Sequence, residues 1–278
     1  MHITASYFDQ ARVETIEAAT IRFPGGEVQV RLSDLDERLH RSGSTFHIRA
    51  DIRSSENLME LLMATDAIRR YEPEAEILLL MPYIPYARQD RVAVPGEALS
   101  IKVFAQIINS QNYNRVGVWD AHSDVSLALL DRAYHVTAAD LIRDRQVQHL
   151  FDGHVIVAPD AGAVKRASAV AKVLGTDLVR AEKTRNSRTG EVTGTRVQNV
   201  GEYGAGSFMI VDDICDGGRT FIELAKGLRR VSERPISLYV THGIFSGGFD
   251  HLRAHLDRII CANVLTDATP PDNFLIKI

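Results

Sequence analysis

Short apolar runs alternate with segments of helical periodicity along most of the chain, and this alternation limits the fold more than any other feature. Strand-like runs lie at 77–81, 116–119, 154–158, 178–180, 208–211 and 236–240. Helical patterns lie at 57–71, 99–109, 163–174 and 220–231. Strands and helices that alternate in this way form mainly parallel sheets covered by helices. The sequence therefore predicts an α/β fold.

The segment 57–71 carries the clearest helical pattern. Its apolar positions recur every three or four residues, at Leu58, Leu61, Leu62, Thr65 and Ile68. Asn57 and Glu60 have the spacing of an N-cap and its reciprocal partner. We expect the apolar stripe of this helix to pack on a sheet.

The order of strands and helices in the first half recurs in the second, which indicates two domains of similar construction. The length of 278 residues fits two domains, because a typical domain has about 150. We expect domains at 1–138 and 139–278, with the last residues returning to the first domain. The polar, glycine-containing segment 184–206 shows no sustained apolar period and is predicted to be a mobile loop or a hairpin.

Charge and cysteine content narrow the class of protein. The 32 basic and 36 acidic residues give a net charge of -4, which offers no general attraction to nucleic acid or to an anionic membrane. No apolar run has the length of a membrane span. Cys215 and Cys261 are too few for a disulfide framework and suit the reducing cytoplasm.

A group of acids and glycines follows the run 208–211 and precedes a helix. It consists of Asp212, Asp213, Asp216, Gly217, Gly218, Arg219 and Thr220. Glycines allow backbone N–H groups to surround a phosphate at a helix N-terminus, and a threonine hydroxyl adds a donor. Carboxylates would repel that phosphate, so we expect them to bind sugar hydroxyls or a cation-bearing ligand. The pattern favours a phosphorylated sugar over the alternative, a helix cap with a tight turn.

Asp160 holds the equivalent position after the run 154–158. A carboxylate there can bind Mg²⁺ directly or through water, and the amides beyond it can contact a diphosphate. The alternative is a capped helix whose basic residues, Lys165 and Arg166, are solvated.

Charged side chains also follow two earlier runs. The loop after 77–81 contains Arg88, Gln89, Asp90 and Arg91. Arginine donates to phosphate oxygens and stacks on purines, which suits a nucleotide, whereas the alternative is a surface loop with an Arg–Asp ion pair. His122 follows 116–119 between two acids and could help to hold magnesium carried by a nucleotide; the alternative is a buried structural histidine.

Lys183 and Arg185 stand where the polar segment begins. Cations on such a loop can stabilise charge that develops on a transferring phosphoryl group, although ordinary solvated charges are the alternative. The sequence contains no Gly-x-Ser-x-Gly elbow, no P-loop and no Gly-x-Gly-x-x-Gly fingerprint. A magnesium nucleotide and a sugar phosphate therefore remain as the expected ligands.

Several segments match one family in order and spacing. They lie at 23–27, 57–62, 83–91, 159–166, 211–216 and 241–243, and the most specific part is Tyr-Ala-Arg-Gln-Asp-Arg at 86–91. Together they resemble the ribose-phosphate diphosphokinases, also called phosphoribosyl pyrophosphate synthetases. The resemblance implies two phosphoribosyltransferase-like domains, each a mainly parallel sheet flanked by helices. It also implies Mg²⁺-dependent transfer of the diphosphoryl group of ATP to the 1-hydroxyl of ribose 5-phosphate.

The resemblance further implies a role for each candidate residue. Ribose 5-phosphate would be bound by Asp212, Asp213, Asp216, Gly217, Gly218, Arg219 and Thr220. ATP would be bound by Arg88, Gln89, Asp90, Arg91 and His122, and by Phe23 and Glu27 of a neighbouring subunit in a homo-oligomer. His122 and Asp160 would hold the metal, and Lys183 and Arg185 would be the catalytic pair.

The chain also departs from the family pattern. Gly25 stands where the family has an aspartate, and Arg219 follows the two glycines of the phosphate loop. Two other functions fit part of the sequence: a catalytically silent regulatory homologue, and a phosphoribosyltransferase that consumes phosphoribosyl diphosphate. The retained cations and metal candidates argue against the first. The 88–91 segment and the first domain argue against the second.

Overall fold

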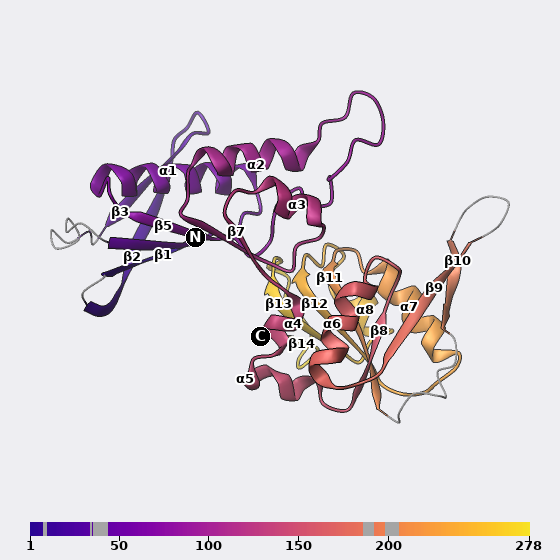
Figure 1. Cartoon of the computed structure of the whole chain (residues 1–278). Helices are drawn as coiled ribbons and strands as arrows, with labels where there is room; N and C mark the ends of the chain where they lie inside the picture. The colour runs from indigo at the N-terminus through magenta and orange to yellow at the C-terminus, as the bar shows by residue number, and fades with distance from the viewer. Residues whose placement is uncertain (8–9, 34, 36–43, 186–191, 198–205) are drawn as a thin grey trace. The chain divides into compact units, whose positions relative to one another are not determined.

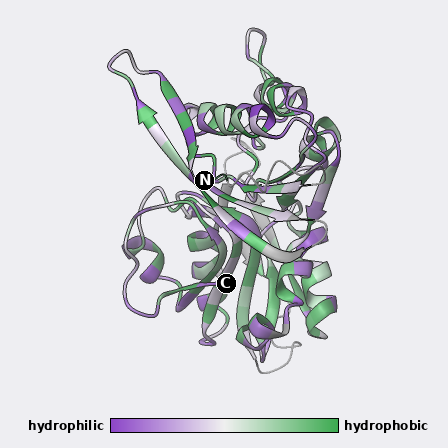
Figure 2. Cartoon of the chain, turned by 90° about the vertical axis from the view of Figure 1, so that its left-hand side faces the viewer, coloured by the Kyte–Doolittle hydropathy of each residue, from purple (hydrophilic) through white to green (hydrophobic). Residues whose placement is uncertain are grey.

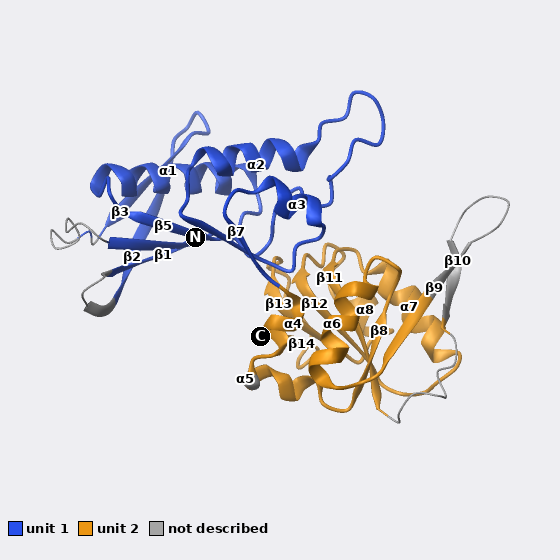
Figure 3. Ribbon diagram, viewed as in Figure 1, with its two compact units in different colours: residues 1–136 blue, residues 137–278 orange. Residues whose placement is uncertain are grey.

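The computed structural model describes residues 1–7, 10–33, 35, 44–185, 192–197 and 206–278 (Figure 1). The chain divides into two compact units, Met1–Val136 and Thr137–Ile278 (Figure 3). Each unit is built on one seven-stranded sheet flanked by helices, so the predicted α/β class is confirmed. No helix in these described ranges is long and apolar enough to cross a membrane.

The sheet of the first unit has the strand order β3-β2-β1-β4-β5-β6-β7. Its strands are β1 His2–Tyr7, β2 Gln10–Arg22, β3 Val28–Ser33, β4 Ser44–Arg49, β5 Glu76–Leu80, β6 Arg115–Trp119 and β7 Ala133–Val136. Strands β4 to β7 are parallel, whereas β1, β2 and β3 add antiparallel pairs beside β4. The sequence analysis predicted no strands for this antiparallel part.

The helices of the first unit are α1 Ser55–Tyr71, α2 Ser100–Ser110 and α3 Asp124–Leu129. The predicted stripe of α1 is buried at Leu61, Thr65 and Ile68 and joins the core formed with the strands. The predicted N-cap is wrong, because the helix begins earlier. Ser54 is the N-cap, and its hydroxyl accepts the backbone N–H of Asn57 at 3.2 Å.

The sheet of the second unit has the order β10-β9-β8-β11-β12-β13-β14, and only β9 and β10 pair antiparallel. Its strands are β8 His154–Ala158, β9 Leu178–Arg185, β10 Val192–Val197, β11 Ser207–Cys215, β12 Ile236–Gly243, β13 Arg258–Val264 and β14 Leu275–Lys277. Its helical segments are α4 Ala138–Ile142, α5 Arg145–Gln148, the 3-10 turn η2 His149–Phe151, α6 Val164–Leu174, α7 Arg219–Arg229 and α8 Asp250–Arg253.

Helices cover both faces of this second sheet. Met209 and Val211 of β11 pack with α4 and α6, whereas Phe208 and Ile210 pack with α7 and α8. A parallel sheet buried on both faces needs continuous apolar strands, and every residue of β12 is buried. Figure 2 shows the hydrophobic colour running along these inner strands.

The last residues do not follow the sequence prediction. They form β14, which pairs with β13 at the edge of the second sheet instead of returning to the first unit. The reason is packing: Phe274 and Leu275 join the core under α7, while Ile276 and Ile278 join the core under α6.

Candidate active site

Strand β11 continues past the apolar run that predicted it, so Asp212 and Asp213 lie within the strand and not after it. Neighbouring β12 has eight residues against nine in β11 and pairs with this extension, matching Asp212 with Val240 and Ile214 with His242. Strand β8 ends earlier, at Ala158, so the acids lie beyond its pairing with β11. The two carboxylates therefore stand at the carboxyl edge of the sheet, where open α/β sheets bind ligands.

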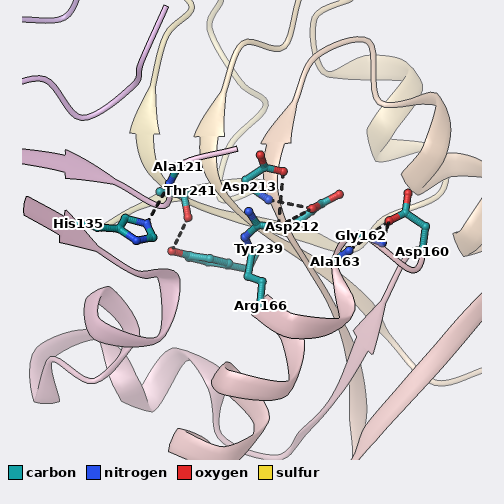
Figure 4. A network of polar contacts seen from close by, with 10 residues as sticks. All are labelled: Ala121, His135, Asp160, Gly162, Ala163, Arg166, Asp212, Asp213, Tyr239 and Thr241. Carbon is teal, nitrogen blue, oxygen red and sulfur yellow. Dashed lines mark hydrogen bonds and ion pairs between the residues drawn. The ribbon is translucent and has the colours of Figure 1, made fainter. Parts of the chain in front are cut away.

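Arg166 of α6 connects these two acids (Figure 4). Its Nη1 lies 3.2 Å from Oδ1 of Asp212 and 3.7 Å from Oδ1 of Asp213. The backbone N–H of Asp213 also donates to Oδ1 of Asp212 at 3.0 Å. The side chain of Arg166 is 14% exposed and those of the acids 18% and 7%. Solvent screening is therefore weak, and the ion pair is stronger than one at the surface.

Asp212 is the most perturbed acid of this group. Burial and the nearby charge of Asp213 raise the pKa of Asp212 well above its ordinary value, and Arg166 opposes the shift. Strongly perturbed carboxylates gather at functional sites. Sequence reasoning noted Arg166 only as a basic residue on the helix and gave it no role at the acids.

The turn after β11 combines a third acid with the start of α7. Asp216 Oδ1 accepts the hydroxyl of Ser246 at 2.6 Å. Gly218 has φ +72° and occupies the N-cap position of α7, so Arg219 and Thr220 begin the helix and are exposed. The first N–H groups of a helix lack partners within it and favour an anion. This turn therefore suits a phosphate.

Packing behind this turn explains why glycine is needed. A Cβ on Gly218 would come within 2.4 Å of Leu252 Cδ2 on α8. Nε2 of His251 lies 3.1 Å from the carbonyl oxygen of Gly217, whereas a Cβ on Gly217 would meet nothing within 4 Å. One side of the turn is thus held by α8.

Asp160 follows β8 and opens the turn that leads into α6. Its Oδ1 accepts the N–H groups of Gly162 at 3.0 Å and Ala163 at 3.2 Å (Figure 4). Because β8 and β11 are parallel neighbours, Asp160 and Asp212 both follow the carboxyl end of the β8–β11 pairing. The described residues contain no group of three or more His, Cys, Asp or Glu arranged to hold a metal. A single carboxylate still fits Mg²⁺, which commonly takes one or two protein carboxylates and completes its shell with substrate phosphates and water.

The loop after β5 presents its polar side chains to solvent. Arg88, Gln89 and Arg91 are exposed and Asp90 is half-buried. Tyr86 has φ +64°, and its carbonyl accepts the N–H of Gln89 at 2.9 Å. A positive φ at a bulky residue is a strained conformation of the kind that gathers at ligand sites.

His122 follows β6, the parallel neighbour of β5, and is exposed, so it is not the buried structural histidine of the alternative interpretation. Asp120 has φ +35° and is buried; its N–H donates to the Val136 carbonyl at 2.7 Å. Nε2 of His135 on β7 accepts the N–H of Ala121 at 3.1 Å (Figure 4). His135 thereby fixes the turn that carries His122. No local sequence signal points to His135, because it lies on β7 whereas its partner, Ala121, follows the end of β6.

The 23–27 segment forms the turn between β2 and β3. The Phe23 N–H donates to the Glu27 carbonyl at 2.9 Å, and Gly26 has φ +94°. Phe23 is exposed. A Cβ on Gly25 would lie 2.5 Å from Glu27 Oε2, so the Glu27 carboxylate fills the space beside this glycine.

Lys183 and Arg185 lie on β9, which extends beyond the predicted end at residue 180. Lys183 pairs with Thr195 and Arg185 with Val192 of β10, so this part of the 184–206 segment is a hairpin. Residues 186–191 and 198–205 of that segment lie outside the described residues.

The structure divides the candidate residues between the two units. Asp160, Asp212, Asp213, Asp216 and the glycine turn belong to the second unit, with Lys183 and Arg185. The 88–91 loop, His122, Phe23 and Glu27 belong to the first. Of the two predicted metal ligands, His122 lies in the first unit and Asp160 in the second.

Comparison with known proteins supplies the remaining evidence. The N-terminal domain of ribose phosphate pyrophosphokinase matches residues 3–111, and a phosphoribosyl transferase domain matches 135–258. The ribose-phosphate pyrophosphokinase of Thermococcus kodakarensis is 32% identical over 92% of this chain and 88% of its own length. The chain belongs to the ribose-phosphate pyrophosphokinase family. The resemblance inferred from the sequence motifs is therefore confirmed.

Other relatives agree with this family. The ribose-phosphate pyrophosphokinase of Pyrococcus furiosus is 30% identical over 95% of this chain and 91% of its own length. The crystal structure of phosphoribosylpyrophosphate synthetase from Mycobacterium smegmatis matches with a TM-score of 0.76 at 25% identity, covering 95% of this chain and 86% of that one. Family and fold together confirm a ribose-phosphate pyrophosphokinase, an enzyme of the transferase class.

Proposed function

We propose that this enzyme transfers the terminal diphosphoryl group of ATP to the 1-hydroxyl of ribose 5-phosphate. The hydroxyl oxygen bonds to the β-phosphorus, the bond from that phosphorus to the α-phosphate oxygen breaks, and AMP leaves while the hydroxyl proton passes to solvent. The observation that carries the proposal is the carboxyl edge of the second sheet. Paired carboxylates, a glycine turn and a helix N-terminus stand there together in a chain of this family.

The sugar phosphate binds at the end of β11. Asp212, Asp213 and Asp216 accept hydrogen bonds from the ribose hydroxyls, because ionised carboxylates are acceptors only. The backbone N–H groups of the turn and of α7 bind the 5-phosphate, with the Thr220 hydroxyl as a further donor. The guanidinium of Arg219 on the first turn adds a positive charge to this phosphate site.

ATP binds through the polar loops of the first unit. Arg88 and Arg91 donate to phosphate oxygens and can stack on the base, while Gln89 and Asp90 make polar contacts to the nucleotide. His122 contacts the phosphates. Phe23 and Glu27 reach the base in a neighbouring copy of the chain, which makes the enzyme a homo-oligomer. The exposure of Phe23 supports that assignment.

Asp160 would hold Mg²⁺ that the ATP phosphates also bind, and His122 would be a further candidate ligand. When bound, this ion neutralises charge on the phosphate oxygens. Gly162 and Ala163 fix the Asp160 carboxylate through their backbone N–H groups, which orients it before the substrates arrive.

Lys183 and Arg185 stabilise the charge that develops during transfer. Their position on the β9–β10 hairpin, beside residues that connect the two strands, is compatible with delivery from a loop. Such chemistry consists mainly of positioning and charge stabilisation, so these cations affect turnover more than binding.

Two free, buried cysteines support the expected reducing, cytoplasmic location.

The direct test is to incubate the purified protein with ATP, Mg²⁺ and ribose 5-phosphate and to measure AMP and phosphoribosyl diphosphate. Both products should appear in equal amounts. Folded protein that forms neither product under varied metal and phosphate conditions would be a silent homologue. Consumption of added phosphoribosyl diphosphate with a free base would instead identify a phosphoribosyltransferase.

A further inference from the structure

Arg166 is the charged residue on α6 that contacts both acids of the sugar site. We propose that Arg166 is a positioning residue for ribose 5-phosphate: it bridges Asp212 and Asp213, offsets part of their shared negative charge and aims both carboxylates at the sugar hydroxyls. This inference rests on the proposed role of the two aspartates in binding the sugar.

The geometry shows why one cation is needed here. Successive side chains of a strand normally point to opposite faces, yet Nη1 of Arg166 lies within 4 Å of both Asp212 and Asp213. Two buried carboxylates that share one site cannot both ionise without compensation. A protonated carboxyl would lose acceptor capacity and present an O–H, which is the wrong complement for a sugar hydroxyl that donates.

The surroundings of Asp212 leave this task to Arg166. Asp213 lies on the same strand, and its charge raises the pKa of Asp212; Asp216 lies farther along the turn and accepts the hydroxyl of Ser246. On β12 the residue opposite Asp212 is Val240, and His242 pairs one step on with Ile214. Strand β8 has ended before this level. Arg166 is the cation that acts on the Asp212 carboxylate within the described part of the second unit, and it opposes the rise in the pKa of that group.

A purely structural role, joining α6 to β11, is the competing explanation. It would lower stability when Arg166 is replaced but would not make sugar binding depend on pH. The control is Arg143→Gln, which removes an arginine from an ion pair with Asp140 at 2.9 Å whose side chains are 63% and 43% exposed. Exposed pairs of this kind contribute little.

The experiment measures ribose 5-phosphate binding by calorimetry without ATP, so that no turnover is required. Wild type, Arg166→Gln, Arg166→Lys and Arg143→Gln are compared at pH 7 and pH 9 in buffers of different ionisation enthalpy. We expect Arg166→Gln to weaken binding at pH 7 by about 10-fold or more, since a shift of one pKa unit corresponds to a factor of ten. We also expect it to release up to about one additional proton on binding, because Asp212 must ionise to accept the sugar.

Both effects should become smaller at pH 9, and Arg143→Gln should match the wild type. Arg166→Lys keeps one charge but loses the guanidinium whose Nη1 reaches both acids. It should show a smaller loss of affinity at pH 7 that also diminishes at pH 9, and it serves as the test should Arg166→Gln fail to fold.

An equal loss of affinity at both pH values with no additional proton release would overturn the proposal and leave Arg166 a structural residue. Unchanged affinity in both variants would overturn it as well. A wild type that binds no ribose 5-phosphate would refute the sugar site itself, and that outcome is separate from any behaviour of the variants.

Discussion

Gly218→Ala tests whether the turn before α7 owes its shape to a glycine. The residue has φ +72°, and a Cβ there would lie 2.4 Å from Leu252 Cδ2, a side chain that is fully buried. The left-handed conformation costs an L-residue about 1–2 kcal/mol. Inserting a methyl group into a packed core costs about 1–3 kcal/mol. We therefore expect a loss of about 2–5 kcal/mol in the free energy of unfolding.

Two other glycines of the same unit separate these causes. Gly217 has space for a Cβ and no positive φ, so Gly217→Ala should change stability by less than about 1 kcal/mol. Gly175 has φ +65° with nothing within 4 Å, so Gly175→Ala reports the backbone cost alone. That cost should be roughly 1 kcal/mol, because alanine also reduces the entropy of the unfolded chain.

Urea unfolding followed by circular dichroism compares the three variants with the wild type. The single tryptophan, Trp119, lies in the first unit, and that unit has its own hydrophobic core. The unfolding midpoint followed by Trp119 fluorescence should therefore stay at the wild-type value. Gly218→Ala should also raise the apparent KM for ribose 5-phosphate, since the displaced turn carries the 5-phosphate donors. If Gly218→Ala unfolds at the same midpoint as Gly217→Ala, neither the positive φ nor the Leu252 contact constrains the turn.

Further predictions concern the reaction. Lys183→Ala should lower kcat by about 10²-fold or more while ribose 5-phosphate binding measured by calorimetry stays close to the wild type; comparable turnover would remove Lys183 from the mechanism. Asp216→Ala should raise the apparent KM for ribose 5-phosphate, and an unchanged KM would show that this carboxylate does not contact the sugar. Chelation of divalent metal should stop AMP formation but leave sugar binding intact, so loss of sugar binding on chelation would contradict the role given to Asp160. The raised pKa of Asp212 predicts that sugar binding weakens on acidification at a pH above the usual titration range of aspartate, because the accepting form is lost as that group gains its proton. Calorimetry across pH checks this, and binding that is constant down to the ordinary aspartate range would refute it.

The sequence predicted elements best where local residues set their ends. The strand 154–158 agrees with β8, because Gly153 precedes it and Pro159 follows it. The helix that stops at Leu174 is closed by Gly175 with φ +65°, a left-handed conformation that glycine adopts without steric cost. In both cases, residues next to the strand or helix in the sequence indicate where it ends.

Prediction failed where a neighbouring strand sets the boundary. Strands β9 and β11 both run farther than their apolar residues suggest, because β10 and β12 supply hydrogen-bond partners to polar residues. Asp212 and Asp213 interrupt the apolar pattern, so the sequence predicted that the strand ends before them. A single-sequence pattern records hydrophobic burial but not the length of the partner strand.

The candidate site shows the same division between local and tertiary information. Acids, glycines and arginines at strand ends could be found from the sequence, because each cluster is contiguous. Lys165 and Arg166 could not be told apart, since both are basic and adjacent; only the position of β11 relative to α6 selects Arg166 for the acids. His135 was missed for the same reason, as its contact with Ala121 depends on how β6 and β7 align.

These tertiary contacts share one physical property: each fixes a group that the sequence had already suggested for binding. Arg166 fixes the carboxylates, His135 fixes the turn before His122, and Leu252 with His251 supports the glycine turn. A supporting group of this kind holds a contacting group in position. Replacing it should therefore change how well a ligand binds without removing the group that contacts the ligand. A variant at a supporting position should therefore lose only part of the ligand affinity and should recover some of it on conservative replacement, which identifies a supporting residue experimentally.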